Sequence, residues 1–298
     1  MVPWNHFVLL LILAAPLPAA DYVGAAACGE CHQAEFAGQS RSGHAHALAP
    51  SAAGQPGDWA FGAGLQAITF LARADAESYR ELGETWYRSL NGYDTTPGHK
   101  NRDGIRFRTF DPAARILRCF ACHSTGPVSL AADESVLPHE LGVRCEVCHG
   151  PGSAHAADPD ANRLRIVPAA DQVLFCGKCH RLELETGEEL TNLADPRILR
   201  SPPRLLAAAA CYIKSGGRLG CVTCHSPHAT LEQDPAAYDP TCKRCHPAAR
   251  HQQPVAGVAC AQCHMPPIRL DNLLFTNHRI AVYQARNPLV PVNVRSKF

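Results

Sequence analysis

The chain has 298 residues, 46% of them hydrophobic and 18% charged, and its formal net charge is +1 at pH 7. Because the arginines are scattered and no basic run is present, nucleic acid is not an expected partner. The length allows one or two domains. The 15 cysteines are the most informative residues in the composition.

The first twenty residues have the pattern of a secretory signal peptide. An apolar run from Phe7 to Ala15 is followed by a short Pro- and Ala-rich stretch and then Asp21, with a cleavage site expected near Ala20. An uncleaved membrane anchor is the alternative, but the run is short for a bilayer span. We therefore expect residues 1–20 to be removed and the mature protein to be periplasmic or extracellular, without predicted membrane association.

Residues 59–93 have strand character. Ile68–Leu71, Tyr79–Leu82 and Thr85–Tyr87 are short, β-prone segments separated by polar residues or glycine. They predict a small antiparallel hairpin or sheet around residues 65–90. Residues 30–40 are compatible with a helix, and from Arg118 onward Pro and Gly interrupt the chain repeatedly, which predicts short helices and loops.

The pattern Cys-x-x-Cys-His occurs seven times, and every Cys-x-x-Cys pair is followed by histidine. Two thiols that can form thioethers with porphyrin vinyl groups, next to a histidine that can bind the iron, form the attachment site of c-type haem. We number the motifs 1 to 7 in chain order: Cys28-Cys31-His32, Cys119-Cys122-His123, Cys145-Cys148-His149, Cys176-Cys179-His180, Cys221-Cys224-His225, Cys242-Cys245-His246 and Cys260-Cys263-His264.

Two other uses of the cysteines are less favoured. A disulfide scaffold gives no reason for a histidine after each pair. Zinc sites would need a second cysteine pair or spaced histidines at a repeating offset, which the sequence lacks. Cys211 lies outside the motifs; a buried thiol is the favoured interpretation, and a haem ligand or redox thiol is the alternative.

Seven covalently attached haems leave roughly forty residues for each. So little protein cannot bury each porphyrin separately, and the haems are expected to stack and form much of the core. The predicted fold is therefore mainly α with much irregular structure, in a single multihaem domain over residues 21–298. Within it we expect one haem and the β insertion in 21–110, a six-haem cluster in 111–280, and a C-terminal tail in 281–298.

The sixth iron ligands must come from elsewhere in the chain. Eight histidines lie outside the motifs and the leader, for seven irons, and all are candidate distal ligands: His44, His46, His99, His139, His155, His228, His251 and His278. His44 and His46 compete most naturally for one position. His155, His228 and His251 follow their motifs too closely to pass around the porphyrin edge, so they are expected to serve a neighbouring haem. His278 could reach either its own haem or another.

Coordination by two histidines leaves no open position on the iron, keeps it low-spin and favours electron transfer. Arg118 and Arg144, beside their motifs, are candidates for hydrogen bonds to haem propionates or are plain surface charges.

The sequence also resembles a known family, the multihaem cytochromes related to the tetrahaem electron carrier of ammonia-oxidising bacteria, which takes electrons from hydroxylamine oxidoreductase. The segments that carry the resemblance are Gly142–His155, Tyr22–Gly24 before motif 1, Cys221–His228, Cys263–Pro266 with Asn277–His278, and Phe61 through Trp86-Tyr87 to His99. It implies a mostly helical fold around paired haems, with distal ligands at His44, His155, His228 and His278. This chain departs from it by carrying seven motifs instead of four.

Three functions are compatible with these patterns. The leading one is a heptahaem electron carrier between redox partners such as a quinol-oxidising complex, a dehydrogenase or a terminal reductase. The second is a reductase of a small nitrogen or sulfur oxide at one five-coordinate haem, since the family carrier has one haem without a distal protein ligand. A subunit of an extracellular cytochrome filament is the third. No catalytic constellation accompanies a motif, so an enzyme is the less favoured reading.

Overall fold

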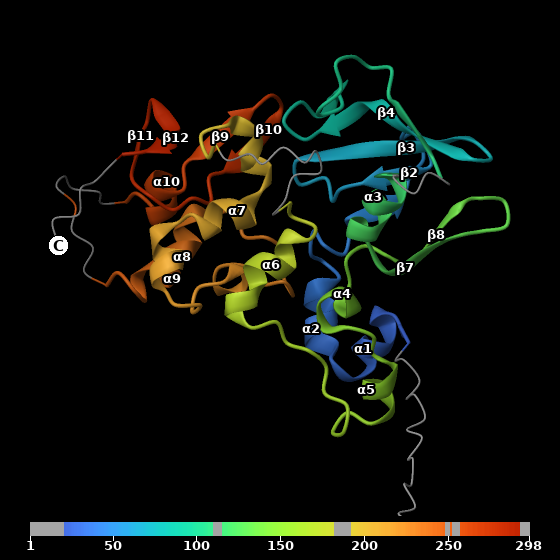
Figure 1. Ribbon diagram of the computed structural model, residues 1–298, viewed down its shortest axis with the longest axis horizontal. Helices are drawn as coiled ribbons and strands as arrows, with labels where there is room; N and C mark the ends of the chain where they lie inside the picture. Colours follow the sequence, from blue (N-terminus) through green and yellow to red (C-terminus); the bar gives the residue numbers. More distant parts are fainter. Residues whose placement is uncertain (1–20, 110–114, 182–191, 248–250, 252–256, 293–298) are drawn as a thin grey trace, which may run out of the picture.

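The computed structural model describes residues 21–109, 115–181, 192–247, 251 and 257–292 (Figure 1). The predicted signal peptide, residues 1–20, lies outside these ranges. One half of the molecule contains a large sheet with the first five helices, and the other contains the later helices with two small hairpins (Figure 1). No helix in the described ranges has the length and apolar character needed to cross a membrane.

The predicted β region forms a six-stranded antiparallel sheet. Its strands are β1 (Leu48–Pro50), β2 (Trp59–Phe61), β3 (Ala67–Asp75), β4 (Ser78–Tyr87), β5 (Gly92–Thr95) and β6 (Ile105–Arg108), in the order β1-β2-β3-β4-β5. The long strand β4 pairs with β6 along its first half and with β5 along its second half. The hairpin expected around residues 65–90 is confirmed as β3–β4, but the sheet extends well beyond it on both sides.

Helices are short throughout the described residues. They are α1 (Ala25–Cys31), α2 (Gln33–Gln39), α3 (Arg115–His123), α4 (Cys145–His149), α5 (Ser153–Ala157), α6 (Gln172–Gly177), α7 (Pro202–Ala207), α8 (Ala210–Lys214), α9 (Asp239–Lys243) and α10 (Cys260–His264), with 3-10 turns η1 (Ala169–Asp171), η2 (Pro196–Arg200), η3 (Cys221–Thr223) and η4 (Pro235–Tyr238). Strands account for nearly as many residues as these helices. The fold is therefore not mainly α, as expected, but a mixture of helix and strand. The helices are short because a five-residue motif needs only one helical turn and Pro or Gly soon follows it.

Three hairpins complete the fold. They pair β7 (Ser124–Leu130) with β8 (Val136–Leu141), β9 (Pro267–Leu270) with β10 (Leu273–Thr276), and β11 (Tyr283–Gln284) with β12 (Asn287–Pro291). The last hairpin lies within the segment that was expected to be a plain C-terminal tail.

A hydrophobic core between the sheet and α3 fixes the position of motif 2. Phe120 is fully buried and its ring contacts those of Trp59, Phe61 and Tyr79 at centroid distances of 5.3, 5.1 and 6.4 Å. Phe120 is also one of the residues between Cys119 and Cys122. The sheet thus packs directly against motif 2.

Replacing Phe120 with alanine is expected to lower the free energy of unfolding by about 3–5 kcal/mol, because a large cavity would remain in this core. Denaturant unfolding followed by circular dichroism measures it. The matched control is Leu90→Ala, at a side chain that is 49% exposed, for which about 0.5 kcal/mol or less is expected. Equal effects of the two substitutions would contradict the assignment of the core.

Hydrogen bonds join the sheet to the C-terminal half. The Gln66 amide donates to the Leu274 carbonyl and its oxygen accepts the Leu274 N–H at 2.8 Å. Asn272 donates to the Asp94 carboxylate at 2.9 Å, and the Ser89 hydroxyl donates to the Asn272 carbonyl at 2.7 Å. The tip of the β9–β10 hairpin is therefore held against the sheet.

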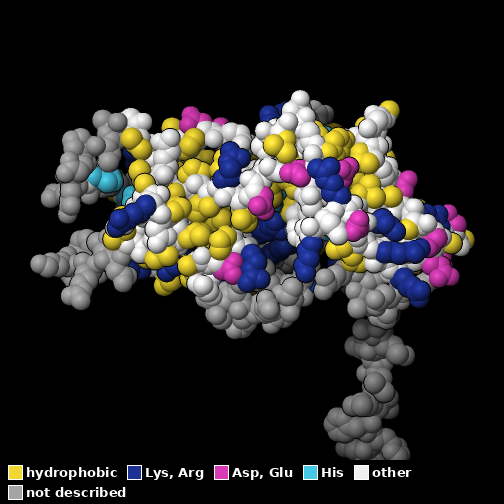
Figure 2. Space-filling view, turned by 90° about the horizontal axis from the view of Figure 1, so that it is seen from above, with side chains coloured by type: hydrophobic (Ala, Val, Ile, Leu, Met, Phe, Trp, Pro, Cys, Tyr) yellow, Lys and Arg dark blue, Asp and Glu magenta, His cyan; other side chains and the backbone are white. Residues whose placement is uncertain are grey.

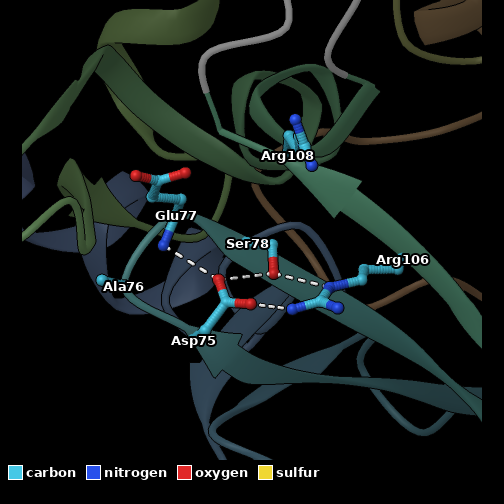
Figure 3. Close-up of a pocket in the computed structure, with 6 residues that line it drawn as sticks. All are labelled: Asp75, Ala76, Glu77, Ser78, Arg106 and Arg108. Atoms are coloured by element: carbon cyan, nitrogen blue, oxygen red, sulfur yellow. Dashed lines mark hydrogen bonds and ion pairs between the residues drawn. The ribbon is translucent and has the colours of Figure 1, made fainter.

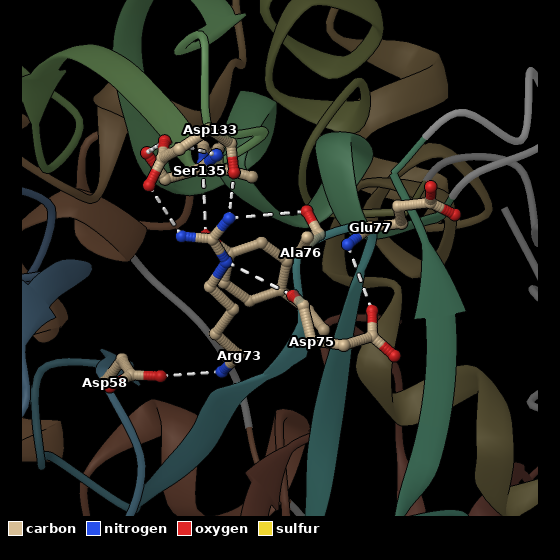
Figure 4. Close-up of polar contacts among 9 residues, drawn as sticks. Asp58, Arg73, Asp75, Ala76, Glu77, Asp133 and Ser135 are labelled. Carbon is tan, nitrogen blue, oxygen red and sulfur yellow. Dashed lines mark hydrogen bonds and ion pairs between the residues drawn. The ribbon is translucent and has the colours of Figure 1, made fainter.

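An arginine fastens the β7–β8 hairpin to the turn between β3 and β4 (Figure 4). The Arg73 guanidinium lies 2.8 Å from the Asp133 carboxylate, and it also donates to the backbone carbonyls of Asp75 and Ala76. Hydrogen bonds from Ser135 and Arg73 hold the pKa of the exposed Asp133 well below its usual range. Because such a pair is exposed, its main effect is to orient the hairpin.

Candidate haem-binding sites

Each motif lies on a single helical turn. In motifs 1, 4, 5 and 6 the histidine N–H donates to the carbonyl of the first cysteine at 2.9, 2.9, 3.0 and 3.0 Å. Residues three and four positions apart face the same side of a helix. Both thiols and the imidazole of a motif therefore face one side, as attachment to a single porphyrin requires. No disulfide bond joins cysteines in the part of the chain that the structure describes, which argues against a disulfide scaffold.

Hydrogen bonds orient several motif histidines. The Nδ1 atoms of His123, His149 and His264 donate to the carbonyls of Ala47, Arg165 and Ala281 at 2.8, 2.9 and 2.8 Å. A ring whose Nδ1–H is bound to a carbonyl has Nε2 as its free ligand atom. These residues therefore fit the role of iron ligand.

Five motif histidines face a second imidazole from outside the motifs. The ring-centroid distances are 6.2 Å for His32–His155, 5.9 Å for His44–His180, 6.1 Å for His149–His228, 6.2 Å for His225–His278 and 6.2 Å for His251–His264. Because a metal–imidazole bond is about 2.0–2.1 Å long, two imidazoles on opposite sides of one metal have ring centres roughly 6 Å apart. The pairs fit an iron between their rings, and each combines one motif histidine with one other.

Comparison with known proteins agrees with this geometry. Residues 81–150, which contain motifs 2 and 3, match the family model "Cytochrome c554 and c-prime". A search of the curated proteins finds no significant match to the sequence. The crystal structure of the outer cell wall cytochrome OcwA superposes with a TM-score of 0.54 at 16% identity, covering 87% of this chain and 79% of that one. In fold and in its motifs, the chain is similar to multihaem c-type cytochromes.

A second solved structure is an undecahaem cytochrome from the S-layer of Carboxydothermus ferrireducens. Its TM-score is 0.47 at 16% identity, and the match covers 84% of this chain but only 45% of that one. A c-type cytochrome carries covalently attached haem with an iron centre, so the motif cysteines and histidines are the candidates for holding it.

The structure brings some of the candidate distal histidines, but not all, next to a motif histidine. His155, His228 and His251 lie opposite the histidine of a motif other than the one they follow, and His278 lies opposite His225 instead of His264. Of the competitors His44 and His46, it is His44 that faces a motif histidine.

Three candidate histidines lie elsewhere. His99 is buried in the sheet half, where its Nε2 is 3.2 Å from the Glu81 carboxylate. The His139 ring contacts Tyr22 at 5.6 Å. Among the described residues, His46, His99 and His139 do not face a motif histidine.

Motifs 2 and 6 have no second imidazole opposite their histidine within the described part of the chain. The His123 ring packs edge to face against Phe61, with the ring centres 5.2 Å apart. His246 precedes residues 248–250 and 252–256, which lie outside the described ranges.

Several imidazoles lie around His180 of motif 4. Burial lowers the pKa of His180 to about 4, with further contributions from His44, His123 and His278. Burial likewise lowers the pKa of His278 to about 4. Both rings are therefore neutral at physiological pH, which is the form that binds a metal.

The other residues singled out from the sequence have structural contacts. The Arg144 guanidinium donates to the Ser40 hydroxyl at 3.0 Å and lies 5.7 Å from the centre of the Phe36 ring. Arg118 is exposed. Cys211 packs against a small apolar cluster with Val173, and burial raises the pKa of its thiol.

Outside the motifs, the surface offers little that resembles a binding site. A cavity of about 410 Å³ at the β3–β4 turn is lined by Asp75, Ala76, Glu77, Ser78, Arg106 and Arg108 (Figure 3). Two of its charges pair with each other, because Arg106 forms an ion pair with Asp75, and Arg106 also donates to the Ser78 hydroxyl at 2.9 Å. On the face seen in Figure 2, basic and acidic side chains are intermixed over the sheet half. Within the described ranges, no three His, Cys, Asp or Glu side chains converge on a separate metal centre.

Proposed function

We propose that the protein is an exported heptahaem cytochrome that carries electrons between respiratory partners, mostly through haems with two histidine ligands. The five imidazole pairs are the observation that carries this proposal, because each would supply two imidazoles to one iron. When bound, each haem supplies one-electron redox chemistry. The chain's own residues attach it, orient both imidazoles and exclude other ligands.

In this proposal the fourteen motif cysteines hold seven haems, and the motif histidines are the proximal ligands. The distal ligands are His155 for motif 1, His228 for motif 3, His44 for motif 4, His278 for motif 5 and His251 for motif 7. Export is supported by the leader sequence, by the location of c-type haem attachment outside the bacterial cytoplasmic membrane, and by the similarity to an outer cell wall cytochrome. The partners would be a quinol-oxidising complex, a dehydrogenase or a terminal reductase.

The test is intact mass spectrometry together with low-temperature EPR of the oxidised holoprotein. We expect seven haems and at least five low-spin irons, because five motif histidines face a second imidazole. Fewer than five low-spin signals in a protein with all seven haems would overturn the pairing.

A second candidate function is reduction of a small nitrogen or sulfur oxide at motif 2. It is favoured by the orientation of His123, whose Nδ1 donates to the Ala47 carbonyl at 2.8 Å while no second imidazole lies opposite the ring within the described residues. A high-spin signal of one iron that Cys119→Ala/Cys122→Ala abolishes would support it, and assays with nitrite, hydroxylamine and nitric oxide would follow. A wild-type spectrum with seven low-spin irons would exclude it.

A further inference from the structure

The haem-binding motifs pack against each other in pairs. Helix α1 packs on α4, α6 on η3, and α9 on α10, which joins motif 1 with 3, motif 4 with 5, and motif 6 with 7. In each pair the first cysteines of the two motifs lie close enough to shift the pKa of each other's thiols: Cys28 and Cys145, Cys176 and Cys221, and Cys242 and Cys260. The same contact occurs in all three pairs, so two packed motifs form a repeated structural unit. The uneven spacing of the motifs along the sequence does not reveal this unit.

In the pair of motifs 1 and 3, a buried carboxylate makes the connection. Glu146 lies between Cys145 and Cys148 and is 2% exposed. Its carboxylate accepts the N–H groups of Val23 and Gly24, immediately before α1, at 2.9 and 2.8 Å. Motif 3 thereby fixes the point at which the helix of motif 1 begins.

The other two pairs contain an equivalent contact. The Gln172 side-chain oxygen, at the start of α6, accepts the N–H of Val222 inside motif 5 at 3.0 Å. The Asp239 carboxylate, at the start of α9, accepts the N–H of Cys260, the first residue of motif 7, at 2.8 Å. In all three pairs, a side chain from one motif segment accepts a backbone N–H at the start of the other.

These contacts determine geometry because the first N–H groups of a helix have no partner within it. A side chain that accepts one of them fixes the position and direction of the helix start. Since each motif is about one helical turn long, fixing its start also fixes both thiols and the imidazole.

We propose that Glu146, Gln172 and Asp239 are positioning residues that hold the motifs in three pairs, so that each pair binds two haems in contact with each other. Motif 2 joins this array separately, since Cys122 lies close enough to Cys179 of motif 4 to raise the pKa of that thiol. The inference rests on the proposed function in one respect, namely that the paired motifs carry haem.

The test compares Asp239→Ala and Gln172→Ala with the wild-type holoprotein. Two porphyrins in close contact give an exciton couplet in Soret circular dichroism, and two nearby ferric irons broaden each other's EPR signals. Each variant should lose about one third of the couplet intensity, because it disturbs one of the three motif pairs. A displacement of about 0.5 Å is already enough to disturb the geometry of a binding site. The EPR signals of two irons should sharpen.

The conservative variants Asp239→Asn and Gln172→Glu keep an acceptor oxygen and should restore the couplet. The matched control is Asp234→Ala, because Asp234 caps η4 through the Ala236 N–H at 2.9 Å without joining two motifs. A couplet that is unchanged in Asp239→Ala and Gln172→Ala, or that the conservative variants fail to restore, would overturn the inference. A wild-type haem count below seven would instead contradict the proposed function, and intact mass separates the two outcomes.

Discussion

Replacing Glu146 with alanine is expected to lower the free energy of unfolding by about 3–5 kcal/mol, because three buried or partly buried N–H groups lose a charged acceptor at once. The carboxylate accepts the N–H groups of Val23, Gly24 and Gly152, at 2.9, 2.8 and 2.8 Å. The methyl group of alanine accepts none of them. Guanidinium unfolding of the purified holoprotein, followed by far-UV circular dichroism, measures the loss.

A second consequence concerns haem attachment at motif 1. Because Glu146 anchors the residues before α1, the alanine variant should mature with a substantial fraction lacking the haem on Cys28 and Cys31. Intact mass resolves species with one haem fewer. Glu146→Gln, which keeps one acceptor oxygen, should lie between the alanine variant and the wild type in both measurements.

Glu30 provides the control for this prediction. It is also a glutamate between the two cysteines of a motif, but it is exposed. Glu30→Ala should change the free energy of unfolding by about 0.5 kcal/mol or less. If Glu146→Ala had an equally small effect, the carboxylate would not be the link between motifs 1 and 3.

Glu146 also shows what the sequence could not reveal. Nothing distinguishes Glu146 from Glu30 in a linear pattern, since both lie between motif cysteines. Only the packing of α1 against α4 buries one of them and brings backbone donors to it. The same holds for Gln172 and Asp239, whose acceptor oxygens reach N–H groups of motifs later in the chain.

The motifs themselves were predictable, because the spacing of two thiols and a histidine is a local property of one helical turn. The central hairpin was predictable for a similar reason, since β3 and β4 are long, β-prone and adjacent. Strands β1 and β2 have three residues each, too few for a pattern. The choice between His44 and His46 depends on the position of His180, far along the chain, and so required the tertiary structure.

Replacing Gly38 with alanine is expected to disturb the imidazole pair of His149 and His228. A methyl group at Gly38 in α2 would lie 2.2 Å from the His228 carbonyl oxygen. Since C···O contacts are normally about 3.3 Å or longer, the segment that contains His228 must move by roughly 1 Å. Metal–nitrogen bonds tolerate only about 0.2 Å. In the proposed assignment, the variant therefore loses the distal ligand of motif 3.

The expected result is one iron that changes from low-spin to high-spin in the EPR spectrum, with the haem count unchanged. His228→Ala should give the same signal, because it removes the imidazole directly. The matched control is Gly92→Ala, where the added methyl group would meet its nearest atom, the Leu90 carbonyl oxygen, at an ordinary 3.6 Å. The proposed pairing predicts a wild-type spectrum for this control. A low-spin spectrum in both Gly38→Ala and His228→Ala would mean that motif 3 takes its second ligand from another residue.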